Sequence, residues 1–153
     1  MGGTLKGEVL MKATPLNEKD LKDLLLSHPL IARLGTVSPK GEVRITPIWF
    51  GHQDGSFLMN TFEDSTHVRS IRRNPRCSLL IDSLEWPYVG VHYWGTANIE
   101  GPENDAEGIA KLFAPYVGSV EAAMGYARQL ISYGKRVYLR FRPERKVTWD
   151  FRA

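Results

Sequence analysis

A short segment in the middle of the chain groups residue types that bind phosphate. Residues 61–69, TFEDSTHVR, carry hydroxyls and cations at the start of a stretch with helical periodicity. The first N–H groups of a helix lack partners within the helix, so they attract anions. Asp64 or Ser65 can cap this helix. The side chains that can donate to phosphate oxygens are Thr61, Ser65, Thr66, His67 and Arg69, with His67 acting as a cation only when protonated.

Arg44 is a second candidate for the same anion. It stands between Val43 and Ile45 in an otherwise apolar strand. An arginine that faces inward there needs an anionic partner, whereas one that faces outward needs none, because side chains alternate along a strand. We favour the inward orientation. The arginines that follow the segment, Arg69, Arg72, Arg73 and Arg76, have the alternative of a solvated helix face.

The sequence shows no constellation for catalysis by side chains alone. It contains no Ser-His-Asp, Cys-His or paired-carboxylate arrangement, and its four histidines lack metal-ligand spacing. Cys77 lies in the apolar run CSLLI and is expected to be a small core residue. Such an absence suits a protein whose cofactor performs the chemistry. We therefore name no catalytic residue and no metal.

The elements that must position these residues are mostly strands. Strand patterns occupy 30–37, 43–50, 56–61, 76–82 and 88–100, with turns at SPKG and HQDG. Helical periodicity occupies 17–27, 63–75, 103–115 and 119–132. A last hairpin joins 135–141 to 146–151 through the turn RPER. About six strands with glycine-marked bends predict a β-barrel with helices outside it.

The composition is that of one ordinary domain. The chain has 153 residues, a net charge of +3 and one cysteine. We expect a single domain over 1–153, with residues 1–16 as a loose N-terminal extension. The mild basic excess suits a small anionic ligand, but it does not by itself indicate nucleic acid. No apolar run is long enough for a membrane span or a secretory signal, so we expect a cytoplasmic protein.

Several runs, in this order and spacing, resemble one family. They are GEVRITPIWF, NTFEDSTHVRSIRRNPRCSLLID, WPYVGVHYWGTANIEG and VYLRFRPERKVTWDF. Over about residues 20–151 the chain resembles the FMN-binding split-barrel family of pyridoxamine 5′-phosphate oxidase and the deazaflavin-dependent reductases. The resemblance implies a six-stranded antiparallel split β-barrel, mainly β with flanking helices. It also implies a homodimer with cofactor sites at the subunit interface.

The resemblance assigns the cofactor site to particular residues. It places the phosphate against Arg44, strand three and the following helix, the flavin ring beside the backbone of 45–49, and a tryptophan near the ring. The implied cofactor-binding residues are Arg44, Ile45, Thr46, Pro47, Ile48, Trp49, Asn60, Thr61, Ser65, Thr66, His67, Arg69 and Trp149. The chain departs from the oxidases at His67 and Trp49, where they have lysine. It also ends before their arginine and histidine for the pyridoxal substrate, so a true pyridoxamine phosphate oxidase is not expected.

Three functions remain open. The first is an FMN-dependent oxidoreductase acting on an unknown small molecule, with a deazaflavin (coenzyme F-420) reductase as its closest variant. The longer anionic tail of the deazaflavin needs more basic surface, which Lys135, Arg136 and residues 72–76 could supply. The second is a flavin-binding carrier or sensor without turnover. The third, a barrel that binds single-stranded nucleic acid, is disfavoured because the basic residues are not concentrated on strands. No membrane partner is expected.

Overall fold

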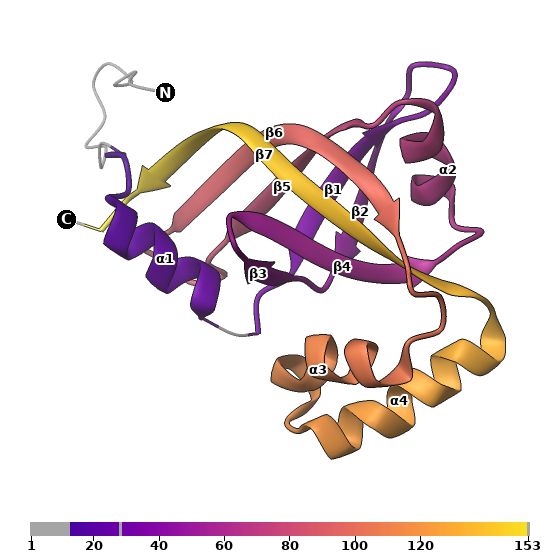
Figure 1. The fold of residues 1–153 in the computed structure, drawn as a ribbon. Coiled ribbons are helices and arrows are strands. Elements are labelled where there is room, and N and C mark those ends of the chain that lie inside the picture. The colour runs from indigo at the N-terminus through magenta and orange to yellow at the C-terminus, as the bar shows by residue number, and fades with distance from the viewer. Residues whose placement is uncertain (1–12, 28, 153) are drawn as a thin grey trace.

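One antiparallel sheet forms the body of the protein. The computed structural model describes residues 13–27 and 29–152, and in them seven strands pair in the order β2-β1-β5-β6-β7-β4-β3. The sheet curls strongly, but its outer strands β2 and β3 do not pair with each other, so the barrel stays split (Figure 1). The strands are β1 (Ala32–Val37), β2 (Val43–Ile48), β3 (Gly51–Gln53), β4 (Ser56–Phe62), β5 (Arg76–Asp82), β6 (Val89–Glu100) and β7 (Arg136–Asp150). The expected mainly-β split barrel with flanking helices is confirmed, with seven described strands instead of six.

Strand β3 (Gly51–Gln53) includes the first two residues of HQDG, a segment that the sequence predicts as a turn. Only Asp54 and Gly55 make the turn, and both have positive φ, 53° and 74°. Two consecutive residues with positive φ form the tight hairpin turn that matches the twist of the flanking strands. His52 and Gln53 are therefore left to pair with β4.

The predicted last hairpin is wrong, because residues 136–150 form the single strand β7. Strand β6 pairs with β7 along its whole length, and the register shifts only between Trp94 and Gly95. Pro143, which has no N–H to donate, lies opposite that shift. A Cβ on Gly95 would clash with the carbonyl oxygen of Arg142. Pro143 and Glu144, in the predicted turn RPER, therefore mark a β-bulge that bends one long strand.

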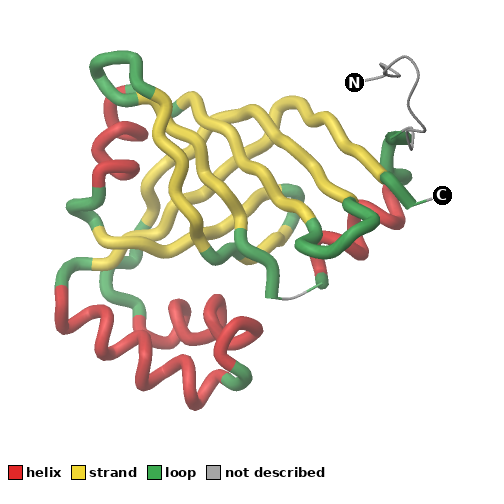
Figure 2. The backbone as a smooth tube through the Cα atoms, turned by 180° about the vertical axis from the view of Figure 1, so that it is seen from behind, coloured by secondary structure: helices red, strands yellow, loops and turns green. Residues whose placement is uncertain are grey.

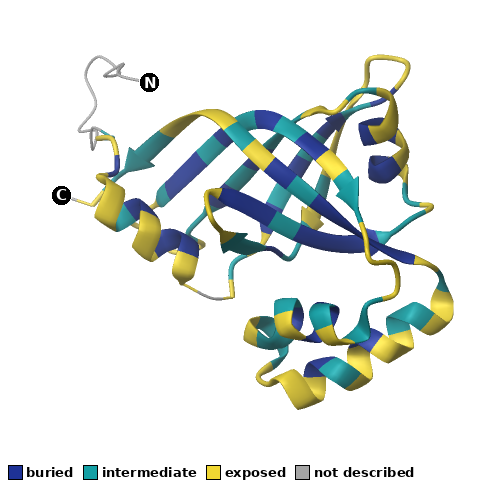
Figure 3. Cartoon of the chain, viewed as in Figure 1, coloured by how far each residue is buried: buried dark blue, intermediate teal, exposed yellow. Residues whose placement is uncertain are grey.

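The main core fills the concave side of the sheet (Figure 3). Helix α1 (Glu18–Leu26) is capped by the Asn17 side chain, as expected, and buries three leucines in this core. Helix α2 (Thr66–Arg73) is capped by Ser65 and buries Val68 and Ile71 in it. Burial of each such side chain contributes roughly 1.5–3 kcal/mol. The core thus fixes the start of α2 close to the end of β4.

A helical hairpin lies beside the sheet, where β6 ends and β7 begins (Figures 1 and 2). Helices α3 (Ala106–Val117) and α4 (Val120–Tyr133) form a second core with Tyr138 of β7. The Tyr116 hydroxyl accepts from the Phe50 N–H at 3.0 Å and donates to the Leu30 carbonyl at 2.7 Å. These bonds hold α3 against the chain before β1 and after β2.

The first part of the expected N-terminal extension, residues 1–12, lies outside the described residues. In the described part, Thr14 bridges Asp150 of β7 and Leu16 joins the main core. Within 13–27 and 29–152, no helix has the length and apolarity needed to cross a bilayer.

The β6–β7 bulge yields a stability prediction. We expect Gly95→Ala to lower the free energy of unfolding by about 1–3 kcal/mol, because the added methyl meets a backbone oxygen. Gly125→Ala is the matched control, since its Cβ would meet nothing within 4 Å, and it should raise stability by about 0.5–1 kcal/mol. Urea denaturation measures both. Equal stability of the two variants would contradict the assignment of a bulge at Gly95.

Candidate functional site

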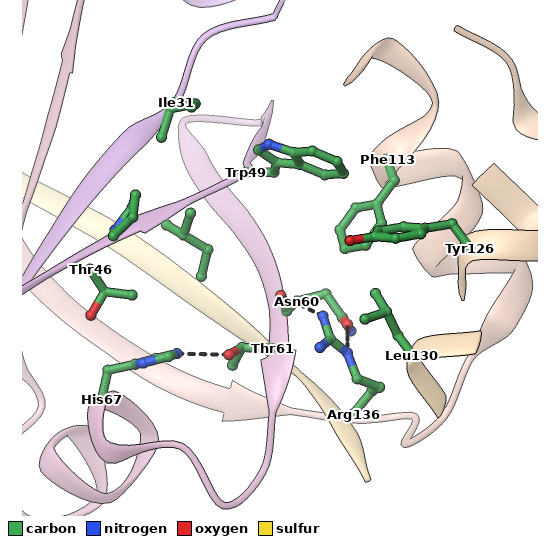
Figure 4. Close-up of a pocket in the computed structure, with 12 residues that line it drawn as sticks. Ile31, Thr46, Trp49, Asn60, Thr61, His67, Phe113, Tyr126, Leu130 and Arg136 are labelled. Carbon is green, nitrogen blue, oxygen red and sulfur yellow. Dashed lines mark hydrogen bonds between the residues drawn. The ribbon is translucent and has the colours of Figure 1, made fainter. Parts of the chain in front are cut away.

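A pocket of about 370 Å³ lies where the split in the sheet meets the helical hairpin (Figure 4). Strand β4 pairs with β3 only as far as Leu58, so its last four residues form a free edge. The pocket extends around this edge from α2 to α4. Its lining residues are Ile31, Thr46, Pro47, Ile48, Trp49, Asn60, Thr61, His67, Phe113, Tyr126, Leu130 and Arg136.

Hydroxyls and a histidine form one end of the pocket, at the N-terminus of α2. Thr61 is buried on the core-facing side of β4, and its Oγ1 lies 2.7 Å from His67 Nε2. Ser65 Oγ lies 3.1 Å from the same nitrogen and also accepts from the Val68 N–H, as the cap of the helix. This end offers hydroxyls, a helix N-terminus and an imidazole to an anion.

Burial and a neighbouring cation keep His67 neutral. Its pKa is lowered from the ordinary value, first by desolvation and then by the positive charge of Arg136. A neutral imidazole exchanges hydrogen bonds with hydroxyls without leaving an unpaired charge. The negative charge of an anion in the pocket counteracts the positive charge of Arg136 and favours the protonated form of His67.

Arg136 forms the other end, on the opposite side of β4. Arg136 is only 5 % exposed. Its Nε donates to Asn60 Oδ1 at 2.9 Å, its Nη2 donates to the Asn60 carbonyl at 3.1 Å, and its guanidinium lies 4.3 Å from the Phe62 ring centre. Among the described residues no carboxylate pairs with it, and burial lowers the pKa of the guanidinium. A buried cation without a counter-ion is costly, which makes this end attractive to an anion.

Aromatic rings line the wall between α3, α4 and the end of β2. The Trp49 ring stacks on Tyr116 with centroids 4.5 Å apart and an interplanar angle of 8°, and it meets Phe113 edge-on at 4.9 Å. Figure 4 shows Trp49, Phe113 and Tyr126 grouped on one side of the pocket. Such a wall suits a flat, apolar ligand surface.

The structure brings together seven of the thirteen residues expected in the cofactor site, and an eighth adjoins them. Thr46, Pro47, Ile48, Trp49, Asn60, Thr61 and His67 line the pocket, and Ser65 contacts His67. Arg44, Ile45, Thr66, Arg69 and Trp149 are not among the lining residues.

Strand register shows how two of the remaining residues lie. Arg44 shares its face of β2 with Thr46, but the residue is exposed and lies outside the pocket lining. Trp149 pairs with Gly90 and shares the outer face of the sheet with Val147. Its side chain therefore points away from the pocket of its own chain.

Sequence reasoning missed the wall contributed by Ile31, Phe113, Tyr126 and Leu130, and it considered Arg136 only as basic surface. Arg136 and Tyr138 alternate with the core residues Val137 and Leu139, so they lie on the outer face of β7. The α3–α4 hairpin covers that face. The alternation of these residues is visible in the sequence, but the packing of the α3–α4 hairpin over that face is not.

Comparisons with known proteins agree with this fold. The family model described as "Pyridoxamine 5'-phosphate oxidase" matches residues 18–150. The conserved hypothetical protein Rv2991 from Mycobacterium tuberculosis is similar in structure, with a TM-score of 0.73 and 26% identity over 90% of this chain and 86% of that chain.

Two further solved structures share the fold at lower identity. An F420 reductase has a TM-score of 0.64 and 22% identity, over 80% of this chain and 92% of that chain. A FAD-binding protein from Mesorhizobium loti has a TM-score of 0.63 and 16% identity, over 90% and 97%. Comparison with curated protein sequences gives no match.

The buried histidine predicts how stability depends on pH. The pKa of His67 is lower in the folded protein than the ordinary value of 6.5, so the unfolded chain binds the proton first as pH falls. Stability should therefore decrease below pH 6.5, by at most about 1.4 kcal/mol per pH unit for each histidine. His67→Gln should flatten this dependence in denaturation curves between pH 7 and 5.

His52 and His92 also have lowered pKa values, so part of the slope should remain in that variant. His92→Gln is the matched control, because His92 lies outside the pocket and is less buried. An unchanged slope in His67→Gln would show that His67 is not buried as a neutral group.

Proposed function

This chain belongs to the pyridoxamine 5′-phosphate oxidase family, and we propose that it is an FMN-binding oxidoreductase that acts on a small molecule. The observation that carries the proposal is a pocket that joins a helix N-terminus, buried hydroxyls and a buried cation without a counter-ion to an aromatic wall. A volume of about 370 Å³ lies in the range of small-ligand pockets. Bound FMN would supply the hydride chemistry, and the chain supplies binding, orientation and exclusion of water.

The hydroxyl end fits the phosphate. Thr61 and Ser65 already surround His67 Nε2, and both hydroxyls can rotate to donate to phosphate oxygens. Thr66 and His67 supply N–H groups of the first turn of α2. Arg44 then closes the phosphate site from the same face of β2 as Thr46, and Arg69 lies one turn further along α2.

The end of β2 fits one face of the flavin ring. Thr46, Pro47, Ile48 and Trp49 line the pocket in sequence, so their backbone forms a continuous wall. Trp49 is held by its stack on Tyr116 and does not need to rearrange. Backbone groups at a strand edge can hydrogen-bond the polar atoms of a flat ring without a dedicated side chain.

Pairing of the surface cations favours FMN over a deazaflavin with a longer anionic tail. Lys135 pairs with Glu103 at 3.1 Å, Arg72 pairs with Glu63 at 3.4 Å, and Arg76 pairs with Glu144 at 2.6 Å. These three are among the basic residues that such a tail would need, and each already pairs with a carboxylate, whereas Arg73 and Arg136 have no such partner among the described residues. The deazaflavin therefore stays the alternative cofactor.

The outer face of the sheet supports a homodimer as part of this proposal. Val43 is 72 % exposed and Ile45 is 70 % exposed on the edge strand β2, and Val147 is 40 % exposed on the same face of β7. Exposed apolar side chains on a sheet face are typical of a protein interface. Because Trp149 points away from its own pocket, only a second copy of the chain can bring this tryptophan to a flavin.

Two variants test the phosphate site. We expect Arg44→Ala and Thr61→Val each to weaken FMN binding roughly 10- to 100-fold, because each removes a bond to a charged group worth roughly 1.5–3 kcal/mol. Quenching of FMN fluorescence on titration measures the dissociation constants. Arg73→Ala, exposed at the end of α2, is the control and should change binding less than threefold. A loss in Arg73→Ala equal to that in Arg44→Ala would indicate only the general positive field, and full FMN affinity in Thr61→Val would contradict the hydroxyl contact.

Interface substitutions test the dimer. We expect Ile45→Lys to turn a dimer into a monomer in light scattering after size exclusion, and to lower FMN affinity at the same time. Tyr133→Lys is the control, since Tyr133 is equally exposed but lies on α4. A variant that is monomeric and keeps full FMN affinity would contradict a site shared between subunits.

Turnover separates an enzyme from a carrier. We expect chemically reduced, FMN-loaded protein to be reoxidised by soluble electron acceptors. When an electron donor is also supplied, the cycle of reduction and reoxidation should repeat. Failure with all donors and acceptors would favour a flavin carrier or sensor.

A further inference from the structure

We propose that the Arg136 end of the pocket binds the carboxylate of a small planar organic acid, a substrate class that rests on the proposed flavin site beside it. The two ends of the pocket differ in position. Asn60 and Thr61 are neighbours on β4, so their side chains lie on opposite faces of the strand. Thr61 reaches the α2 end, and Asn60 reaches Arg136. One bound phosphate therefore satisfies the α2 end and leaves the other end available.

The charge of Arg136 has no counter-ion in the described part of the chain. The residue is 5 % exposed, and its printed polar partners are the side-chain and main-chain oxygens of Asn60, both uncharged. Several more exposed arginines of this protein pair with carboxylates, as Arg140 does with Glu100 at 2.7 Å. Arg136 is more buried than these arginines and has no such partner among the described residues.

The guanidinium is fixed in orientation and still has free donors. An arginine offers five N–H groups, and Asn60 uses two of them, one on Nε and one on Nη2. Nη1 makes no hydrogen bond within the described residues, and Arg136 contributes to the lining of the pocket. The Nη1–Nη2 edge is the edge that a carboxylate binds with two parallel hydrogen bonds.

The walls around this edge select a flat ligand. Tyr126 and Leu130 of α4 lie beside Arg136, and Trp49 and Phe113 continue the wall (Figure 4). Tyr126 is 42 % exposed, so this end opens to solvent and a small acid can enter from there. The ligand that fits a carboxylate site next to aromatic and apolar walls is an aromatic or otherwise planar acid.

The test compares benzoate with its uncharged analogue benzamide, by calorimetry on the FMN-loaded protein. We expect benzoate to bind at least tenfold more tightly than benzamide. Arg136→Met should remove that preference, and Arg136→Lys should keep part of it. Arg73→Ala should leave the benzoate constant within twofold, because Arg73 is exposed at the end of α2 and lies outside the pocket lining.

A second variant keeps the test decisive if Arg136→Met fails to fold. Asn60→Asp places a carboxylate where the amide now accepts from Arg136, with almost no change in shape. It should keep or raise the melting temperature, because the new carboxylate supplies the counter-ion of Arg136, and it should weaken benzoate binding at least tenfold. Equal binding of benzoate and benzamide, or an unchanged benzoate constant in Asn60→Asp, would overturn the proposal.

Competition separates this inference from the proposed function. If FMN displaces benzoate, Arg136 belongs to the cofactor phosphate, and the acid site is overturned while the flavin site stands. If FMN binds and benzoate does not, the acid site alone is overturned. If benzoate binds through Arg136 and FMN does not bind at all, the flavin function is overturned and the anion site at Arg136 stands.

Discussion

The unpaired edges of the split sheet shape the site. Backbone N–H and C=O groups at an edge need partners, and in this protein side chains supply several of them. The Tyr116 hydroxyl serves the Phe50 N–H and the Leu30 carbonyl, and Arg136 serves the Asn60 carbonyl. Both side chains come from the segment after β6, namely α3 and the start of β7. Tyr116 of the hairpin and Arg136 of β7 therefore satisfy backbone groups next to the split without closing the barrel, and the pocket is the space that remains.

The electrostatics of the pocket follow from its position around the edge of β4. The edge of β4 separates two polar ends, one with a neutral histidine among hydroxyls and one with a buried guanidinium. Their coupling is direct, since the charge of Arg136 helps to lower the pKa of His67. An anion at either end relieves this repulsion and favours the protonated form of His67. The chain offers no carboxylate among the pocket-lining residues to do the same.

Local patterns predicted the parts of the site that lie on regular elements. The β-branched run ending at Trp49, the polar end of β4 and the capped start of α2 all face the pocket at Thr46, Thr61 and His67. Other features depend on contacts between distant segments. The sequence around Pro143 predicts a turn, because the bulge at this position can be seen only in the pairing of β7 with β6. The role of Arg136 depends on a helical hairpin folding over its strand, which no local pattern encodes.

The absorption spectrum of the purified protein, with mass spectrometry of whatever heat releases from it, tests the central claim most directly. The account predicts a flavin band and the mass of FMN, released in proportion to protein. A protein without visible absorption, which releases neither FMN nor a deazaflavin even after incubation with both, would contradict it.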